Sequence, residues 1–358
     1  MGLVRLFLAL VVAEDHWRIF MLRPRSVGLE DLSKLGFNAG YAVMFFYIVS
    51  GFLITYTLSR NYEQNAAGVL AFYKNRFVRI FALYWPIALL AILLVPHTWA
   101  TFLAASLPDQ LTSIFLIGVD WRVAFASYPA THFAAMLHPL PQTWTLGAEL
   151  SFYLAAPFLM RWWKIGATLL IASFAMRAYF VASYGTDLQA IWTYHFTGTS
   201  FGFFMLGHLV CKASTRWRLL LSPILGWVLL AASLWTMAFA GSYASYDTPR
   251  FWGATLLFTL ALPGLFEATK NVRWMNMAGD LSYPAYLVHT LLLYLVAPWL
   301  ITFVLPIEYL GVVGAGHFSV AAFLCVTLVA AFLAHRLLEI PTAHAMRTVL
   351  SARKLRSA

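Results

Sequence analysis

Four groups of ionisable residues lie inside apolar, helix-length stretches of the sequence, where charge is costly and usually serves function. They are Glu14-Asp15-His16, Arg76-Phe77-Val78-Arg79, Glu149 and His289. Histidine takes and returns protons near neutral pH, and arginine forks suit phosphate or carboxylate groups. The residue types therefore predict acid–base chemistry close to an anion-binding site.

The two histidines are expected at the same depth of a membrane. Arg5 precedes His16 by eleven residues, about 16 Å along a helix, which is half of a hydrocarbon core of about 30 Å. His289 follows the turn at Gly279-Asp280 by about ten residues, so it reaches a similar depth. The pair could meet on neighbouring helices and move a proton. The alternative for each is a structural histidine that is hydrogen-bonded inside the bundle.

The arginine pair and the glutamate each allow two interpretations. Arg76 and Arg79 are three residues apart and share a helix face, so both could hold one anion. The alternative is anchoring at the inner interface or binding of a lipid headgroup. Glu149 lies in the segment Trp144–Glu149. It could pair with an arginine, or it could orient a catalytic group or an acceptor hydroxyl.

The composition indicates that these groups lie in a membrane protein. The chain has 358 residues, of which 61% are hydrophobic and 11% charged, and its mean hydropathy is +0.75. A soluble domain is about one quarter charged, so the sequence excludes a soluble enzyme, a disordered chain and a disulfide scaffold. The net charge of +10 indicates cytoplasmic anchoring of a membrane protein rather than nucleic acid, so we expect membrane lipid and no nucleic acid among the partners.

We expect an all-α fold, a polytopic bundle of about ten transmembrane helices, with residues 1–340 as the membrane domain and 341–358 as a basic cytoplasmic tail. Residues 96–141 are too long for a tight loop and carry several prolines, so they predict an outer loop with interfacial or re-entrant helices. A cap without function and a two-span hairpin are the alternatives. The expected spans are 2–20, 40–59, 77–95, 142–160, 165–182, 191–211, 222–240, 251–268, 278–303 and 318–338.

The basic residues predict the orientation. With the N-terminus inside, 17 of the 24 Lys and Arg residues fall on the inner side. The positive-inside rule then places both termini in the cytoplasm, as an even number of spans requires. We expect a multi-pass protein of the inner, cytoplasmic membrane.

Two other motifs do not carry chemistry. Gly198-Thr199-Ser200-Phe201-Gly202 fits G-x-S-x-G, but a nucleophile elbow needs a strand-turn-helix context, so Gly198 and Gly202 are interpreted as a helix-packing pair. His335 and Glu339 are four residues apart without further ligands at metal spacing, so no metal site is predicted.

In their order along the chain, six segments resemble the integral-membrane acyltransferase 3 family of O-acyltransferases. Each segment alone is weak evidence, but all six in this order are specific to that family. They are the Arg5-x10-His16 spacing, Phe45–Ile54 (FFYIVSGFLI), Phe72–Trp85 (FYKNRFVRIFALYW), Trp144–Tyr153 (WTLGAELSFY), Leu281–His289 (LSYPAYLVH) and Glu339–Pro341 (EIP).

The resemblance implies ten helices, His16 as the essential histidine, and Arg76 and Arg79 as contacts of an acyl-CoA donor on the cytoplasmic side. Arg5 and Tyr84 are further candidates for acyl-CoA binding. The acyl group is expected to be acetyl, from acetyl-CoA. The acceptor is expected to be a hydroxyl of an envelope or extracellular glycan or a related molecule. No hydrolase-like domain follows the last span, so we expect a stand-alone membrane member without a metal.

In this hypothesis His16 removes the proton of the acceptor hydroxyl, and the thioester oxyanion needs a hydrogen-bond donor. His289, Ser50 and Trp144 are unranked candidates for that donor, and Glu149 completes the catalytic set. Transfer is expected to be direct, without an acyl-enzyme on Ser50. The rival hypotheses are a transporter or flippase of a lipid-linked sugar and a structural membrane scaffold, and the sequence predicts no oligomeric state.

Overall fold

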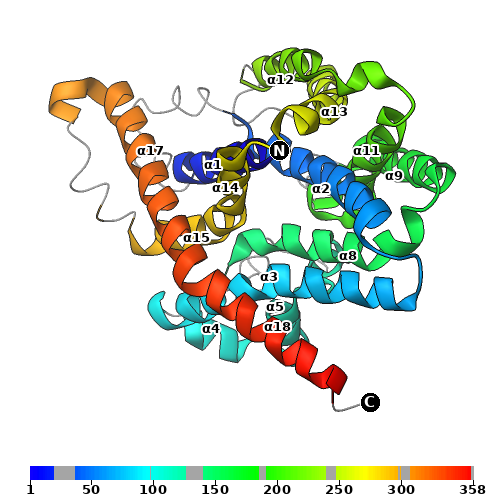
Figure 1. The fold of residues 1–358 in the computed structure, drawn as a ribbon. Helices are drawn as coiled ribbons and strands as arrows, with labels where there is room; N and C mark the ends of the chain where they lie inside the picture. Colours follow the sequence, from blue (N-terminus) through cyan, green and yellow to red (C-terminus); the bar gives the residue numbers. More distant parts are fainter. Residues whose placement is uncertain are drawn as a thin grey trace.

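The computed structural model of the chain describes residues 1–19, 37–96, 98–125, 140–184, 191–238, 247–296, 299 and 307–355. All regular elements in these ranges are helices, which confirms the all-α prediction. Figure 1 shows them as one bundle, with α3 and α8 side by side below the N-terminal helix α1 and the pair α12–α13 above it.

Each expected span coincides with one helix or two consecutive helices. The helices are α1 (Gly2–Trp17), α2 (Ala39–Asn61), α3 (Ala66–Leu94), α8 (Trp144–Leu159), α9 (Trp163–Ser183), the π-helical turn η5 (Ile191–His195) with α11 (Thr197–Ser214), α12 (Pro223–Ala238), α13 (Pro249–Thr269), α14 (Arg273–Asp280) with α15 (Ser282–Leu295), and α17 (Ile307–Ala334).

Five of the described helical runs are long and apolar enough to cross a membrane: α2, α3, α9, α13 and the run 318–351. The helices α1, α8 and α15 have 16, 16 and 14 residues. These three carry His16, Glu149 and His289, and much of their surface is buried inside the bundle. Ten spans and two cytoplasmic termini therefore stay predictions, while the polytopic helical architecture is established.

Helix α3 begins eleven residues earlier than the expected span. The Asn65 side chain accepts a hydrogen bond of 2.8 Å from the amide of Gly68, a cap that starts the helix at Ala66. Arg76 and Arg79 therefore lie well inside α3 rather than at its first turn. The helix continues before and after both arginines, which fixes their backbone positions.

Helices α2 and α11 meet at two glycines. A Cβ atom on Gly51 would lie 1.9 Å from the carbonyl oxygen of Phe204, and one on Gly207 would lie 2.0 Å from that of Ile48. Such contacts bring the two backbones together as in small-residue packing of membrane helices. They set the rotation of α2, which carries Ser50.

The glycine pair of the G-x-S-x-G match packs against a neighbouring helix, as predicted. A Cβ atom on Gly202 would lie 2.3 Å from the ring of Phe174 in α9. The amide of Gly202 donates to Ser173 Oγ at 2.8 Å, and Ser173 Oγ donates to the carbonyl of Gly198 at 2.7 Å. The segment is thus part of a helix interface.

The described part of the outer loop contains three short helices, α4 (Thr98–Ala104), α5 (Leu107–Phe115) and α6 (Val119–Phe125). Helices of seven to nine residues span about 10–14 Å, which is shorter than a membrane-spanning helix. Asp120 of α6 is fully buried and accepts a hydrogen bond from Thr197 of α11. This contact holds α6 against α11, while residues 126–139 lie outside the described residues, so a re-entrant outer loop stays a prediction.

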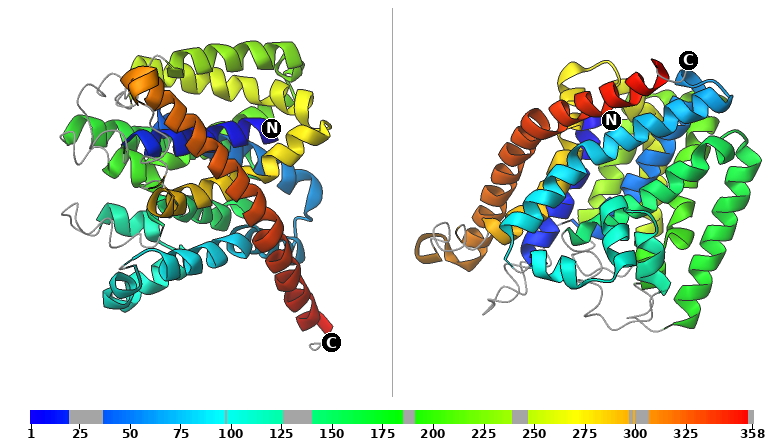
Figure 2. Two further views of the ribbon diagram at one scale, coloured as in Figure 1. Left: turned by 90° about the vertical axis from the view of Figure 1, so that its left-hand side faces the viewer. Right: turned by 90° about the horizontal axis from the view of Figure 1, so that it is seen from below.

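The C-terminal segment is one helical run in which the last span and the basic tail are continuous. Helix α17 continues through the π-helical turn η7 (His335–Glu339) into α18 (Ile340–Leu355). Figure 2 shows this run crossing the bundle along α3 and extending beyond it. Residues 341–355 of the expected tail are thus helical.

Candidate active site

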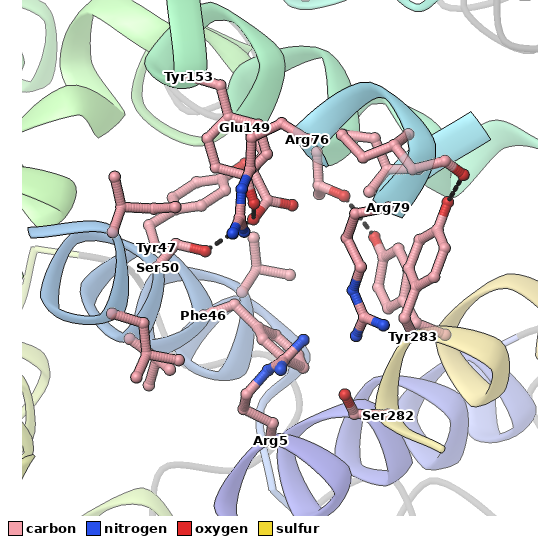
Figure 3. Close-up of a pocket in the computed structure, with 18 residues that line it drawn as sticks. Arg5, Phe46, Tyr47, Ser50, Arg76, Arg79, Glu149, Tyr153, Ser282 and Tyr283 are labelled. Carbon is pink, nitrogen blue, oxygen red and sulfur yellow. Dashed lines mark hydrogen bonds between the residues drawn. The ribbon is translucent and has the colours of Figure 1, made fainter. Parts of the chain in front are cut away.

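A pocket lies between α1, α2, α3, α8 and α15 (Figure 3). The space between its walls, including the open mouth, is about 910 Å³. The pocket is lined by Arg5, Val43, Phe46, Tyr47, Val49, Ser50, Leu53, Ile54, Arg76, Arg79, Ile80, Thr145, Leu146, Glu149, Tyr153, Ser282, Tyr283 and Tyr286.

Three arginines enter this pocket from two helices, Arg5 from α1 and Arg76 and Arg79 from α3. The Arg76 guanidinium lies 5.6 Å from the ring centre of Tyr153, and that of Arg79 lies 5.8 Å from the ring centre of Tyr283. Aromatic faces hold guanidinium planes without using their N–H donors. The predicted convergence of Arg76 and Arg79 on one space is therefore present, and the N–H groups suit an anion.

Glu149 holds hydroxyl groups. Its Oε1 accepts a hydrogen bond of 2.7 Å from Ser50 Oγ and another from the Tyr153 hydroxyl. Arg5 and Arg76 interact with Glu149 electrostatically, and the ion pairs recorded among the described residues do not include it. Of the two interpretations of Glu149, the geometry favours the orientation of hydroxyls.

His16 and His289 form the contact that the sequence predicted. His16 Nδ1 lies 2.9 Å from His289 Nε2. His289 Nδ1 lies 3.3 Å from the carbonyl oxygen of Ala285, which can only accept, so the proton of neutral His289 is on Nδ1 and its Nε2 accepts. His16 Nδ1 then donates to His289, which leaves the lone pair on His16 Nε2. In this tautomer His16 is prepared to take a proton.

Tyr286 separates the pocket from the histidine pair. Its ring lines the pocket, and its ring centre lies 5.7 Å from that of His289. Its hydroxyl donates to the carbonyl of Gln142 at 2.9 Å and lies 2.7 Å from Thr145 Oγ1. The histidines are not among the described residues of the pocket lining, and His289 connects the wall residue Tyr286 to His16.

Two predicted site residues lie elsewhere. The Trp144 ring packs against Tyr194 and His195, and the Tyr84 hydroxyl donates to the carbonyl of Ser113. Neither residue is among the described residues of the pocket lining. Both therefore point away from the pocket.

Sequence reasoning missed four tyrosines of the pocket lining. Tyr153 lies four residues after Glu149, and Tyr286 lies three residues before His289, so helical spacing could have identified both. Tyr47 and Tyr283 also line the pocket. Nothing in their spacing to the histidines or arginines singled them out.

Glu339 is part of the surroundings of the site. Its Oε1 accepts a hydrogen bond of 3.2 Å from Arg79, and its Oε2 lies 2.7 Å from His335 Nδ1. The π-helical turn η7 thus places a buried carboxylate against a pocket arginine. Among the described residues no group of three His, Cys, Asp or Glu side chains could hold a metal ion.

Comparison with known proteins agrees with this geometry. The family model described as an acyltransferase domain matches residues 2–336. Nodulation protein 10 of Rhizobium leguminosarum bv. viciae is 28% identical to this chain over 312 residues, which cover 82% of each of the two chains. No solved structure matches. The protein is a membrane acyltransferase, and the chain belongs to the acyltransferase 3 family.

Proposed function

We propose that the protein transfers an acyl group from cytoplasmic acyl-CoA to a hydroxyl of an envelope or extracellular glycan or a related acceptor. The proposed acyl group is acetyl. One observation carries this proposal. Arg5, Arg76 and Arg79 line a pocket whose wall residue Tyr286 backs directly onto the His16–His289 pair. An anion-binding site and a proton acceptor are thus joined within one bundle.

The pocket suits the chemistry of acyl-CoA. Its three arginines would bind phosphate groups through charge-assisted hydrogen bonds. Its apolar wall, with Phe46, Leu53 and Ile54, would hold the uncharged pantetheine arm. Tyr84 lies outside this wall, so we assign the donor to Arg5, Arg76 and Arg79.

The chemistry follows from the tautomer of the histidine pair. His16 Nε2 takes the proton of the acceptor hydroxyl while the hydroxyl oxygen attacks the thioester carbon. The carbon–sulfur bond then breaks, and the CoA thiolate receives the proton. Holding both substrates in one bundle makes the reaction effectively intramolecular. His289 orients His16, much as a second group orients the base in a catalytic triad.

The rival function is a transporter or flippase of a lipid-linked sugar. Polar residues in mid-membrane occur in both classes. Membership of an acyltransferase family favours the enzyme.

Purified protein in lipid nanodiscs separates the two functions. We expect release of CoA from acetyl-CoA that depends on a glycan acceptor and is lost in His16→Ala. Mass spectrometry of envelope glycans from cells with and without the gene would identify the acyl group by its added mass. Glycans of unchanged mass, together with no CoA release by the purified protein, would contradict the proposal.

The orientation has its own test. Asn65 and Ile117 are both exposed. A cysteine at Asn65 should react with an impermeant maleimide only from the cytoplasm, and one at Ile117 only from outside. Reaction of both cysteines from the same side would contradict the proposal that the donor binds from the cytoplasm and the acceptor enters from outside.

A further inference from the structure

The hydroxyl groups of the pocket lining fall into two classes. Six of the seven have hydrogen-bond partners within the protein. Ser50 and Tyr153 donate to Glu149, Ser282 to the carbonyl of Gly279, Tyr283 to that of Ile80, and Thr145 and Tyr286 to that of Gln142.

The seventh hydroxyl belongs to Tyr47. It is buried without a hydrogen-bond partner among the described residues, and the whole side chain is 3% exposed. A buried polar group without a partner costs about 1–3 kcal/mol. Such a group in a native structure calls for an explanation, and a missing ligand is one. Among the described lining residues, Arg76 Nε is the other buried donor without a hydrogen-bond partner.

The position of the Tyr47 hydroxyl is set by packing. Its ring stacks on Phe204 with ring centres 4.5 Å apart, at the crossing of α2 and α11 where Gly51 allows close approach. Tyr47 lies one helical turn before Ser50 on the same helix (Figure 3). The Tyr47 hydroxyl is therefore held in the pocket wall, on the same helix as Ser50.

We propose that the Tyr47 hydroxyl is the donor that stabilises the oxyanion of the thioester during acyl transfer. This inference rests on the proposed function. Two other candidates are already occupied: Ser50 donates to Glu149, and His289 Nε2 faces His16. Trp144 lies outside the pocket lining, against Tyr194. Tyr47 is the lining hydroxyl whose proton is unused.

The bond changes are balanced. The acceptor oxygen forms a bond to the thioester carbon, and the carbonyl electron pair moves onto its oxygen, which then accepts the hydrogen bond from Tyr47. When the carbonyl re-forms, the carbon–sulfur bond breaks. The proton that His16 took from the acceptor goes to the CoA sulfur. Tyr47 keeps its proton throughout, because it stabilises charge without transferring it.

Tyr47→Phe tests this role because it removes only the hydroxyl. We expect kcat to fall about 10²-fold, as for the loss of one oxyanion donor. The dissociation constant of CoA itself, which has no thioester carbonyl, should stay within twofold. The melting temperature should be unchanged or higher, because an unpaired buried group is removed.

Tyr73→Phe is the matched control. The Tyr73 hydroxyl donates to the carbonyl of Leu154 at 2.6 Å and lies outside the pocket lining. We expect this variant to keep its kcat and to lose some thermal stability. Tyr47→Phe should therefore lose activity without losing stability, and Tyr73→Phe should lose stability without losing activity.

Two results would overturn the assignment of Tyr47. One is a kcat of Tyr47→Phe within threefold of the wild type. The other is a weaker binding of CoA that accounts for the whole loss, which would make Tyr47 a contact of the pantetheine arm. A wild-type protein without any acyl transfer would instead defeat the proposed function, so the two failures are distinguishable.

Discussion

Arg177 and Arg76 both lie inside the helical bundle, and the protein satisfies them differently. Arg177 is 1% exposed, its Nε donates to Asp247 Oδ1 at 2.6 Å, and another nitrogen donates to the carbonyl of Thr193. Arg76 lines the pocket, and its Nε has no partner among the described residues. Arg177 also keeps one buried nitrogen without a partner, so the difference lies in the carboxylate: Asp247 pairs with Arg177, whereas no ion pair recorded among the described residues includes Arg76. Charge within the bundle therefore indicates a ligand site where it lines a pocket and has no ion-pair partner.

Two buried histidine sites differ in their surroundings. His208 is fully buried, its Nδ1 lies 3.0 Å from Thr55 Oγ1, and its Nε2 has no hydrogen-bond partner among the described residues. Its ring is pressed against α9, where a Cβ atom on Gly166 would lie 2.4 Å from it. His16 is instead paired with His289 close to the pocket wall. One histidine fastens helices together, and the other is positioned for chemistry.

The largest expected effect is on His16. His16→Ala should lower turnover by about 10²–10⁴-fold, the usual contribution of a general base, while the protein remains inserted and folded. His208→Ala should instead lower the melting temperature with turnover per folded molecule largely kept. Rates from single-turnover assays and melting curves in detergent check both. More than one tenth of wild-type turnover in His16→Ala would remove His16 from the catalytic role.

Arg177→Ala should destabilise the fold rather than weaken substrate binding. Removing one partner of a buried ion pair leaves an unpaired charge and costs about 3–5 kcal/mol. The free energy of unfolding should fall by about that amount, whereas the donor KM of the folded fraction should not change. A raised donor KM with normal stability would place Arg177 in the substrate site and break the contrast with Arg76.

Arg76→Ala and Arg79→Ala should act in the opposite way. Each loses charge-assisted hydrogen bonds to the donor, which are worth about 1.5–3 kcal/mol, so the donor KM should rise about 10- to 150-fold. The acceptor KM should change far less. If the donor KM is unchanged in both variants, these arginines are topological anchors or lipid contacts.

Glu339→Gln should have the smallest effect. Glu339 holds one nitrogen of Arg79, and Arg79 is one third exposed, so the pair contributes little by itself. The donor KM should rise a few-fold, and the rise should vanish in the Arg79→Ala background because the two residues act together. Glu267→Gln is the control, since Glu267 pairs with Lys270 away from the pocket lining. Additive effects in the double variant would show that Glu339 acts independently of Arg79.

The sequence alone determined the helical class and predicted a common depth for the two histidines. The rise of a helix per residue is constant, so the distance from Arg5 to His16 follows from counting residues. The same count placed His289 at the depth of His16, and the 2.9 Å contact agrees with it. The convergence of Arg76 and Arg79 was also predictable, because residues three apart share a helix face.

The tertiary structure decided which side chains face the pocket. Trp144 and Tyr84 belong to motifs of the site yet point away from it, while Tyr47, in a motif position with no assigned role, has the unused hydroxyl. Rotation of one helix against another depends on contacts between backbones, such as Gly51 against Phe204, and hydropathy carries no information about them. Which hydrogen bonds are already formed depends on the same contacts, so the partner of Glu149 and the isolation of Tyr47 could be known only from the packed bundle.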